Sequence, residues 1–298
     1  MKRREFLQNA VCGSLMFNAF EGLPLRQAEG PPDLSLVSGA SPDALTRKAV
    51  ELLGGMSQYI TKGDVVLVKP NIAFDRKPRF AGCTNPEVVK TVVELCLEAG
   101  AKEVRVMDNP VHPAAATYIN SGIAEAVEQA GGRVIYPETN RLESVALNGK
   151  NLKTAAVFTD ILEVDKIINV PILKTHPFTR LTMGLKNLMG AIGGNRSIYH
   201  QDVDEVIVDL AGYFKPVLTI LDAYRVMAKN GPDGGRISDV NMLETVIAGR
   251  DFVAVDALGA TLCNYKPKAL SFLKIANKVG LGEIDLQKLR IEMRSRKS

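Results

Sequence analysis

The sequence predicts an α/β protein: a largely parallel sheet with helices on both faces, plus a small hairpin insertion. Short apolar runs typical of buried strands alternate with helical patterns along most of the chain. The 298 residues are 46% apolar and 23% charged, which is a globular composition with enough length for a sizeable core. We expect an export signal over residues 1–30, one domain over 31–285 and a charged tail over 286–298.

Cap and turn signals place the individual elements. The first buried strand covers residues 65–68, and Asn85-Pro86 then opens a helix that runs to Glu98 and stops at Gly100. Asn148-Gly149 predicts the turn of the hairpin within residues 141–163. The remaining strands are expected over residues 104–107, 134–136, 166–170, 217–221 and 244–248, and the remaining helices over 121–130, 206–214 and 252–263.

The composition excludes several classes of protein. The formal net charge is only +4 and tryptophan is absent, so neither a basic nor an aromatic surface for nucleic acid is expected. No two cysteines form a C-x-x-C pair, so we expect neither a zinc ribbon nor an iron–sulfur cluster. The cysteines are Cys12, Cys83, Cys96 and Cys263.

The N-terminus resembles an export signal. Arg3-Arg4 is followed by Phe6-Leu7, an apolar stretch over residues 10–20 and a polar exit. The stretch is too short to span a bilayer, so no membrane span is expected in the mature protein. Adjacent arginines indicate the twin-arginine route, with the export machinery as partner and a periplasmic or other extracytoplasmic location. The alternative is a short amphipathic leader on a cytoplasmic protein.

Polar side chains follow the predicted strands at the points where the strands end. Parallel strands place their carboxyl ends on one edge of the sheet, where ligands of open α/β folds bind. These residues are therefore expected to converge, unless they are polar merely because loops are polar. They are Lys69, Asn71, Asp108, Lys174, His176 and Asp222.

Basic residues and glycines are concentrated between residues 174 and 200, where two of the three histidines lie. Glycines let backbone amides approach an anion and the basic side chains add charge, so the segment resembles a cradle for an anionic ligand or cofactor. No phosphate-binding loop of nucleotide-binding spacing is present. The segment contains Lys174, His176, Arg180, Lys186, Arg196 and His200, with Gly184, Gly190, Gly193 and Gly194.

Two further segments carry candidate residues. The loop over residues 230–236 contains Gly234, Gly235 and Arg236 and is interpreted as a lid or anion-binding nest, or as an ordinary surface turn. Asp251 is expected to cap the following helix. Asp256 lies inside that apolar helix, where a buried structural role is as plausible as a functional one.

Several of these segments resemble the domain-of-unknown-function 362 family. The matching pieces lie within about residues 60–285 and occur in the family's order. The resemblance implies the same α/β domain and supplies no reaction. The clearest pieces are VVLVKPN at 65–71, IINVPILKTH at 167–176, GLKNLMG at 184–190, NGPDGG at 230–235 and AGRDFVAVDA at 248–257.

Residues 176–200 are also similar to part of the nickel-pincer lactate racemases. That resemblance implies Lys186 as the attachment point of a pincer cofactor, His200 as a nickel ligand and His176 as a ligand or an acid/base group. Neutral imidazole is a suitable nickel ligand. A metal held through His176 and His200 is therefore an expectation from this resemblance.

We expect an exported protein that binds a small anionic ligand or cofactor at the carboxyl edge of its sheet and that could be a metal-dependent enzyme. Lys69, Lys174 and Lys186 would neutralise the anion, and His176 or His200 would move protons or hold a metal. Asp108 and Asp222 would orient these groups or bind a cation. The alternatives are a non-catalytic periplasmic binding or accessory protein, and a fold in which these residues only satisfy one another.

Overall fold

A computed structural model describes residues 30–39 and 41–295, excluding the side chains of Ser197 and His200. The predicted export signal, apart from Gly30, lies outside these residues. In the described part of the chain, no helix is long and apolar enough to cross a membrane.

The core of the fold is a ten-stranded sheet in the order β12-β1-β11-β10-β7-β2-β3-β4, with β8 pairing with β10 and β9 pairing with β8. The run from β10 to β4 is parallel, and β11 is antiparallel to both of its neighbours. This confirms the largely parallel sheet. The strands are β1 (Leu34–Ser38), β2 (Val65–Pro70), β3 (Glu103–Val106), β4 (Arg133–Val134), β7 (Lys166–Val170), β8 (Ile172–His176), β9 (Arg180–Thr182), β10 (Leu218–Met227), β11 (Val240–Gly249) and β12 (Ile291–Ser295).

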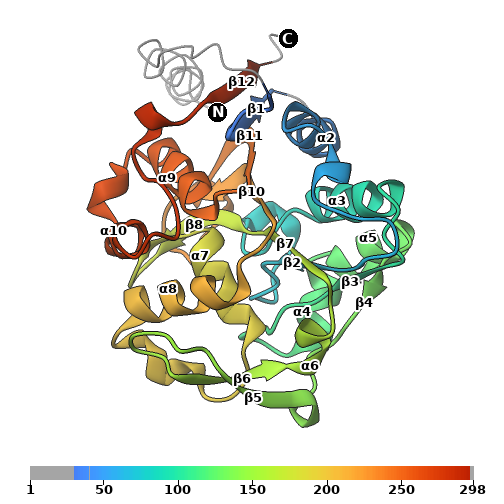
Figure 1. The fold of residues 1–298 in the computed structure, drawn as a ribbon, viewed down its shortest axis with the longest axis vertical. Coiled ribbons are helices and arrows are strands. Elements are labelled where there is room, and N and C mark those ends of the chain that lie inside the picture. The colour runs from blue at the N-terminus through green and yellow to red at the C-terminus, as the bar shows by residue number, and fades with distance from the viewer. Residues whose placement is uncertain (1–29, 40, 296–298) are drawn as a thin grey trace.

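Helices cover both faces of this sheet, as predicted (Figure 1). Helices α2 to α5 pack on one face and α7 to α10 on the other, each group over its own apolar core. The helices are α2 (Pro42–Leu52), α3 (Pro86–Glu98), α4 (Ala114–Asn120), α5 (Ile123–Gln129), α6 (Thr159–Leu162), α7 (Gly184–Asn187), α8 (Val203–Phe214), α9 (Phe252–Leu262) and α10 (Ser271–Lys278). Short 3-10 helices include η4 (Leu188–Ala191), η5 (Arg196–His200), η6 (Ile237–Asp239) and η8 (Leu286–Lys288), together with η1 (Met56–Gln58), η2 (Pro78–Phe80), η3 (Thr139–Arg141) and η7 (Pro267–Ala269).

Two helices begin at the N-cap residues that the sequence predicts for them. The Asn85 side chain accepts a hydrogen bond from the Glu87 amide at the start of α3. Pro86 fits the first turn because it has no backbone N–H that would need a partner there. The Asp251 carboxylate accepts the amides of Val253 and Ala254 at the start of α9. Both helices therefore begin where the sequence predicts.

The predicted hairpin consists of β5 (Leu142–Ala146) and β6 (Thr154–Phe158), which pair antiparallel at the lower end of the molecule in Figure 1. Its turn is held by α8, because the Asp209 carboxylate accepts the backbone amides of residues 150–152 at 2.7–2.9 Å. The hairpin is therefore fixed to the helical layer that also supports the candidate site.

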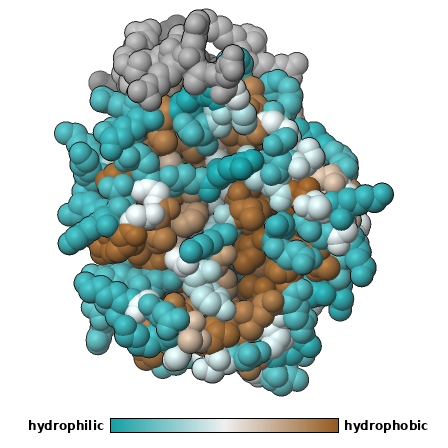
Figure 2. Space-filling view, in the orientation of Figure 1, coloured by the Kyte–Doolittle hydropathy of each residue, from teal (hydrophilic) through white to brown (hydrophobic). Residues whose placement is uncertain are grey.

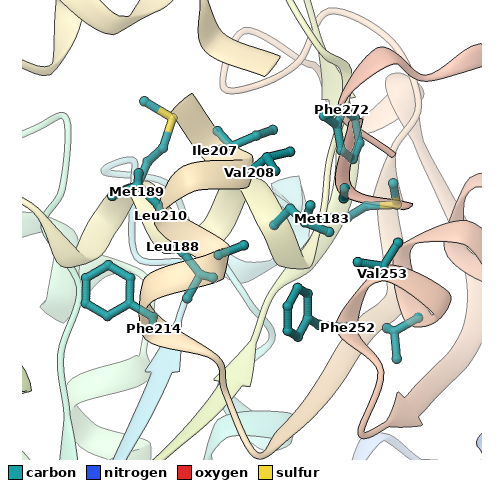
Figure 3. Packing of buried hydrophobic residues seen from close by; sticks show 14 of the residues in the cluster. Met183, Leu188, Met189, Ile207, Val208, Leu210, Phe214, Phe252, Val253 and Phe272 are labelled. Atoms are coloured by element: carbon teal, nitrogen blue, oxygen red, sulfur yellow. The ribbon is translucent and has the colours of Figure 1, made fainter. Parts of the chain in front are cut away.

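A dense apolar cluster holds the segment from β9 to η4 in place (Figure 3). Met183 and Leu188, on either side of α7, are fully buried. They pack in one cluster with side chains of the neighbouring helices: Ile207, Leu210 and Phe214 of α8, Phe252 and Val253 of α9, and Phe272 of α10. This packing gives the short helix α7 a rigid base that its own length would not provide.

The segment expected as a charged tail, residues 286–298, forms regular structure in its described part. Residues 291–295 form β12, which pairs in parallel with β1, and residues 286–288 form η8. Ile291 and Met293 alternate with charged residues and pack against the core, so a period-two strand pattern was present among the charges. Other elements that the sequence did not predict include β1, α2, α4, α6, β8, β9 and α10.

Apolar residues also reach the surface between the charged side chains. Figure 2 shows such areas on the face drawn in Figure 1. Exposed apolar side chains include Val111, Phe178, Ile119 and Val279.

Because Met293 packs on the core from an edge strand, Met293→Ser is expected to lower the free energy of unfolding by about 1 kcal/mol. Arg294→Ser is the matched control: Arg294 is exposed in the same strand, so its loss is expected to stay within about 0.5 kcal/mol. Urea unfolding of both variants measures the difference. Equal, near-zero effects would mean that this segment is the loose tail after all.

Candidate functional site

A cavity of about 530 Å³ opens at the carboxyl ends of β2 and β3 and beside β8. Segments far apart in the sequence form its walls, as expected for the carboxyl edge of a parallel sheet. Polar lining residues include Asn71, Asp108, Asn109, Lys174, His176, Thr182, Lys186, Asn187 and Arg196, and apolar ones include Phe74, Val111, Phe178 and Met189.

A buried ion pair lies under this cavity. Lys69 Nζ is 2.7 Å from Asp108 Oδ1, and both side chains are almost completely buried. The second carboxylate oxygen of Asp108 accepts the Ile72 amide at 2.6 Å, and Lys69 also donates to the Pro70 carbonyl. Burial lowers the pKa of Lys69. The two predicted strand-end residues therefore meet, and they neutralise each other.

A chain of side-chain amides continues from the ion pair across the cavity floor. Asn187 donates to Asn169 Oδ1 and to the Lys69 carbonyl, and it accepts a hydrogen bond from Asn71. Asn71 in turn accepts from Lys174 Nζ at 3.1 Å. Each side-chain amide has one donor side and one acceptor side, so this series of hydrogen bonds sets the orientation of both Asn71 and Lys174.

Three cations line the cavity: Lys174, Lys186 and Arg196. Burial lowers the pKa of Lys174 to about 8, and the same cause lowers the pKa of Lys186 to about 8. Lys174 lies 4.6 Å from the centre of the Phe74 ring and donates to the Gly82 carbonyl. Within the described residues, none of the three cations forms an ion pair with a carboxylate. The cavity therefore has an excess of positive charge.

His176 lines the same cavity with a defined ring orientation. Its Nδ1 accepts the backbone amide of Phe178 at 3.2 Å, and the two rings lie 5.7 Å apart. A neutral imidazole that accepts at Nδ1 carries its proton on Nε2. His176 therefore meets Lys174 and Lys186 in one cavity, as the sequence predicts.

Part of the segment predicted to cradle an anion binds a group of the protein itself, whereas Gly190 and Gly194 of the same segment line the cavity. The amides of Gly184 and Leu185, at the start of α7, donate to the two oxygens of Asp256 at 2.6 and 2.9 Å. Asp256 is fully buried in α9, and burial raises its pKa to about 7. These amides bind the protein's own carboxylate rather than a ligand, which explains the polar residue inside an apolar helix.

Other predicted site residues lie away from the cavity wall. Asp222 is buried beneath α3, where it accepts the amides of Asn85 and Tyr224, and burial raises its pKa to about 6. Of the 230–236 loop, Pro232 lines the cavity but Gly234, Gly235 and Arg236 do not. The Gly235 carbonyl accepts from Arg76, and the Arg236 amide donates to Asp239. The His200 side chain lies outside the described residues.

Polar residues at the site that the sequence did not predict include Asn169, Asn187, Tyr118 and Thr182. The Tyr118 hydroxyl accepts the Asp108 amide and donates to the Asp108 carbonyl, so it fixes the backbone that carries the ion pair. Asn169 and Asn187 are amides inside otherwise apolar runs, and that contrast was an available signal. Thr182 gives no such signal.

The metal expected through His176 and His200 stays a prediction, because the His200 side chain lies outside the described residues. No group of three histidine, cysteine or carboxylate side chains in the described ranges could hold a metal ion. His176 Nδ1 accepts a backbone amide, and the Asp108 oxygens accept hydrogen bonds from Lys69 and Ile72.

Gly190 is required by the ion pair. A Cβ at this position would overlap Asp108 Oδ1 and come within 2.7 Å of Lys69 Nζ. Gly190→Ala should therefore separate two buried charges and lower the free energy of unfolding by about 3 kcal/mol or more. Chemical unfolding measures the loss.

Gly212→Ala is the control for this substitution. Gly212 lies inside α8, and an added Cβ would meet only Leu281 atoms at 3.7 and 3.8 Å, an ordinary contact. It should be neutral or stabilise by roughly 0.5–1 kcal/mol. A Gly190→Ala protein as stable as Gly212→Ala would contradict the packing described here.

Comparison with known proteins places this chain in a family. A family model described as a domain of unknown function (DUF362) matches residues 66–261. A thylakoid-associated protein of Synechocystis sp. is 30% identical over 253 residues, which cover 80% of this chain and 75% of that protein.

Two solved structures match this chain at low sequence identity. The lactate racemase apoprotein of Thermoanaerobacterium thermosaccharolyticum has 12% identity and a TM-score of 0.51, covering 80% of this chain and 58% of its own. A Thermotoga maritima protein has 13% identity and a TM-score of 0.45, with 76% and 60% covered. The chain thus spans less than two thirds of either structure, and at such identity the racemase likeness shows the fold alone. On the family model and the 30% identical relative, the chain belongs to the DUF362 family.

Proposed function

We propose that this protein binds a small organic anion in the cavity at the carboxyl edge of its sheet. The observation that carries the proposal is the uncompensated charge of Lys174, Lys186 and Arg196. Burying a cation without a carboxylate partner costs free energy in the ligand-free protein, and a bound anion would offset that cost.

An unpaired hydroxyl supports the same proposal. Thr182 Oγ1 is buried in the cavity wall and has no hydrogen-bond partner among the described residues. A buried polar atom without a partner costs roughly 1–3 kcal/mol. A carboxylate or phosphate oxygen next to it would accept its hydrogen bond, so a ligand completes what the protein leaves open.

In addition to binding an anion, residues of the cavity could transfer protons. Lys186 has a pKa of about 8, which suits a general acid or base near neutral pH, and His176 lies in the same cavity with its Nε2 proton defined. Without such transfer, the protein would be a binding or accessory protein, which remains the alternative.

We propose an extracytoplasmic location, on the sequence of the N-terminal signal. The Synechocystis relative is named for its association with the thylakoid, and such a location is compatible with this proposal. The signal supports export by the twin-arginine route.

Acetate and inorganic phosphate are suitable probes for the anion site, with binding measured by calorimetry. Lys186→Gln should weaken the binding of either probe about tenfold, because one charge-assisted contact is lost. Lys268→Gln is the control: Lys268 is exposed and does not line the cavity, so its removal should leave binding unchanged. Equal affinities for the wild type and Lys186→Gln would contradict the assignment.

The lowered lysine pKa values also give a pH dependence. Lys174 and Lys186 carry charge below about pH 8 and lose it above, whereas acetate stays ionised throughout. Acetate affinity should therefore fall as the pH rises from about 7 to about 9, well before an ordinary lysine titrates. An affinity that stays constant over this range would show that these two lysines do not hold the anion.

A further inference from the structure

The polarity of the cavity changes from its floor to its rim. On the floor, Asn71, Lys174 and Asn187 are 7%, 1% and 2% exposed. At the rim, Val111 and Phe178 also line the cavity but are 64% and 61% exposed. One charged and two neutral polar side chains are thus buried while large apolar side chains face water, the reverse of an ordinary protein surface.

Apolar side chains connect the rim to the cationic floor. The Phe74 ring lies beside Lys174 Nζ at 4.6 Å, and the Phe178 ring lies beside His176 at 5.7 Å. The remaining apolar wall consists of Ala73, Pro110, Pro177, Met189 and Pro232. A ligand held by the lysines would therefore extend along an apolar surface toward solvent.

Single exposed apolar residues are common on protein surfaces and need no explanation. Ile119 and Val279, which are 65% and 57% exposed, are of this kind because neither lines the cavity. Val111 and Phe178 differ because they come from separate segments, after β3 and between β8 and β9, and line the same opening. Their common position points to a ligand.

We propose that the ligand is amphipathic: a carboxylate or phosphate head joined to an apolar body such as an aromatic ring or a short alkyl chain. This inference rests on the proposed anion site and specifies the class of ligand. A bare anion would leave the apolar rim in water, whereas an apolar body would cover Val111 and Phe178 and gain hydrophobic stabilisation. The cavity of about 530 Å³ is in the range of small-molecule sites.

Two matched pairs of probes test the proposal by calorimetry: phenylacetate against acetate, and phenylphosphate against inorganic phosphate. In at least one pair, the phenyl compound should bind about tenfold to a hundredfold more tightly, since burial of one ring supplies that difference. The pair with the larger gain identifies the head group.

Substitutions at the rim then test which residues provide the higher affinity for the phenyl compound. The double substitution Val111→Ser with Phe178→Ala should remove most of the advantage of the phenyl compound over the matching bare anion, with both affinities measured in the same variant. Val279→Ser is the matched control, because Val279 is similarly exposed outside the cavity, and it should leave the advantage intact.

The outcomes separate this inference from the proposed function. Equal affinities within both pairs would overturn the amphipathic ligand while leaving the anion site in place. An advantage that survives the double substitution would also overturn it. If none of the four probes binds, the anion site itself fails, and the inference fails with it.

Discussion

The burial of Lys69 together with Asp108 is the constraint on which the rest of the site depends. Two charges removed from water are tolerated only when every remaining hydrogen-bonding position is satisfied. The fold supplies these partners from several elements: the Ile72 amide and the Pro70 carbonyl after β2, and the Tyr118 hydroxyl, which holds the Asp108 backbone from α4. Gly190 of η4 closes over the pair because no side chain fits there.

This constraint also explains the charge of the cavity. Among the described residues, Asp108 is the one carboxylate in the cavity lining, and its charge is already compensated by Lys69. Lys174 is instead held by neutral groups, Asn71 and the Gly82 carbonyl, and burial keeps its pKa near 8. The ion pair and the chain of asparagines thus form a rigid polar floor whose remaining positive charge faces the cavity.

The sequence predicts the part of the site that follows from strand polarity. Lys69, Asn71, Asp108 and Lys174 meet because parallel strands align their carboxyl ends. Asp222 was expected to follow the end of its strand, but β10 continues to Met227, and the Asp222 carboxylate accepts the Asn85 amide beneath α3. Strand polarity fixes which edge a residue reaches, whereas the direction of its side chain depends on tertiary packing.

Two other differences have related physical causes. The amides at Gly184 were expected to bind an external anion, but Asp256, a distant residue of α9, occupies them, and spacing along the chain does not reveal that contact. Charge concealed the edge strand β12, since Glu292 and Arg294 made residues 291–295 resemble a tail although Ile291 and Met293 face the core. The fold class and the hairpin were predictable because they depend on local periodicity and turn chemistry.

A double-mutant cycle between Lys69 and Asp108 tests the central claim most directly. Lys69→Met and Asp108→Asn are combined, and the free energy of unfolding of the two single variants and the double variant is measured in urea. If the buried pair organises the site, each single variant leaves an unpaired buried group, and the coupling energy should be about 2 kcal/mol or more. Effects that add within about 0.5 kcal/mol would contradict the account.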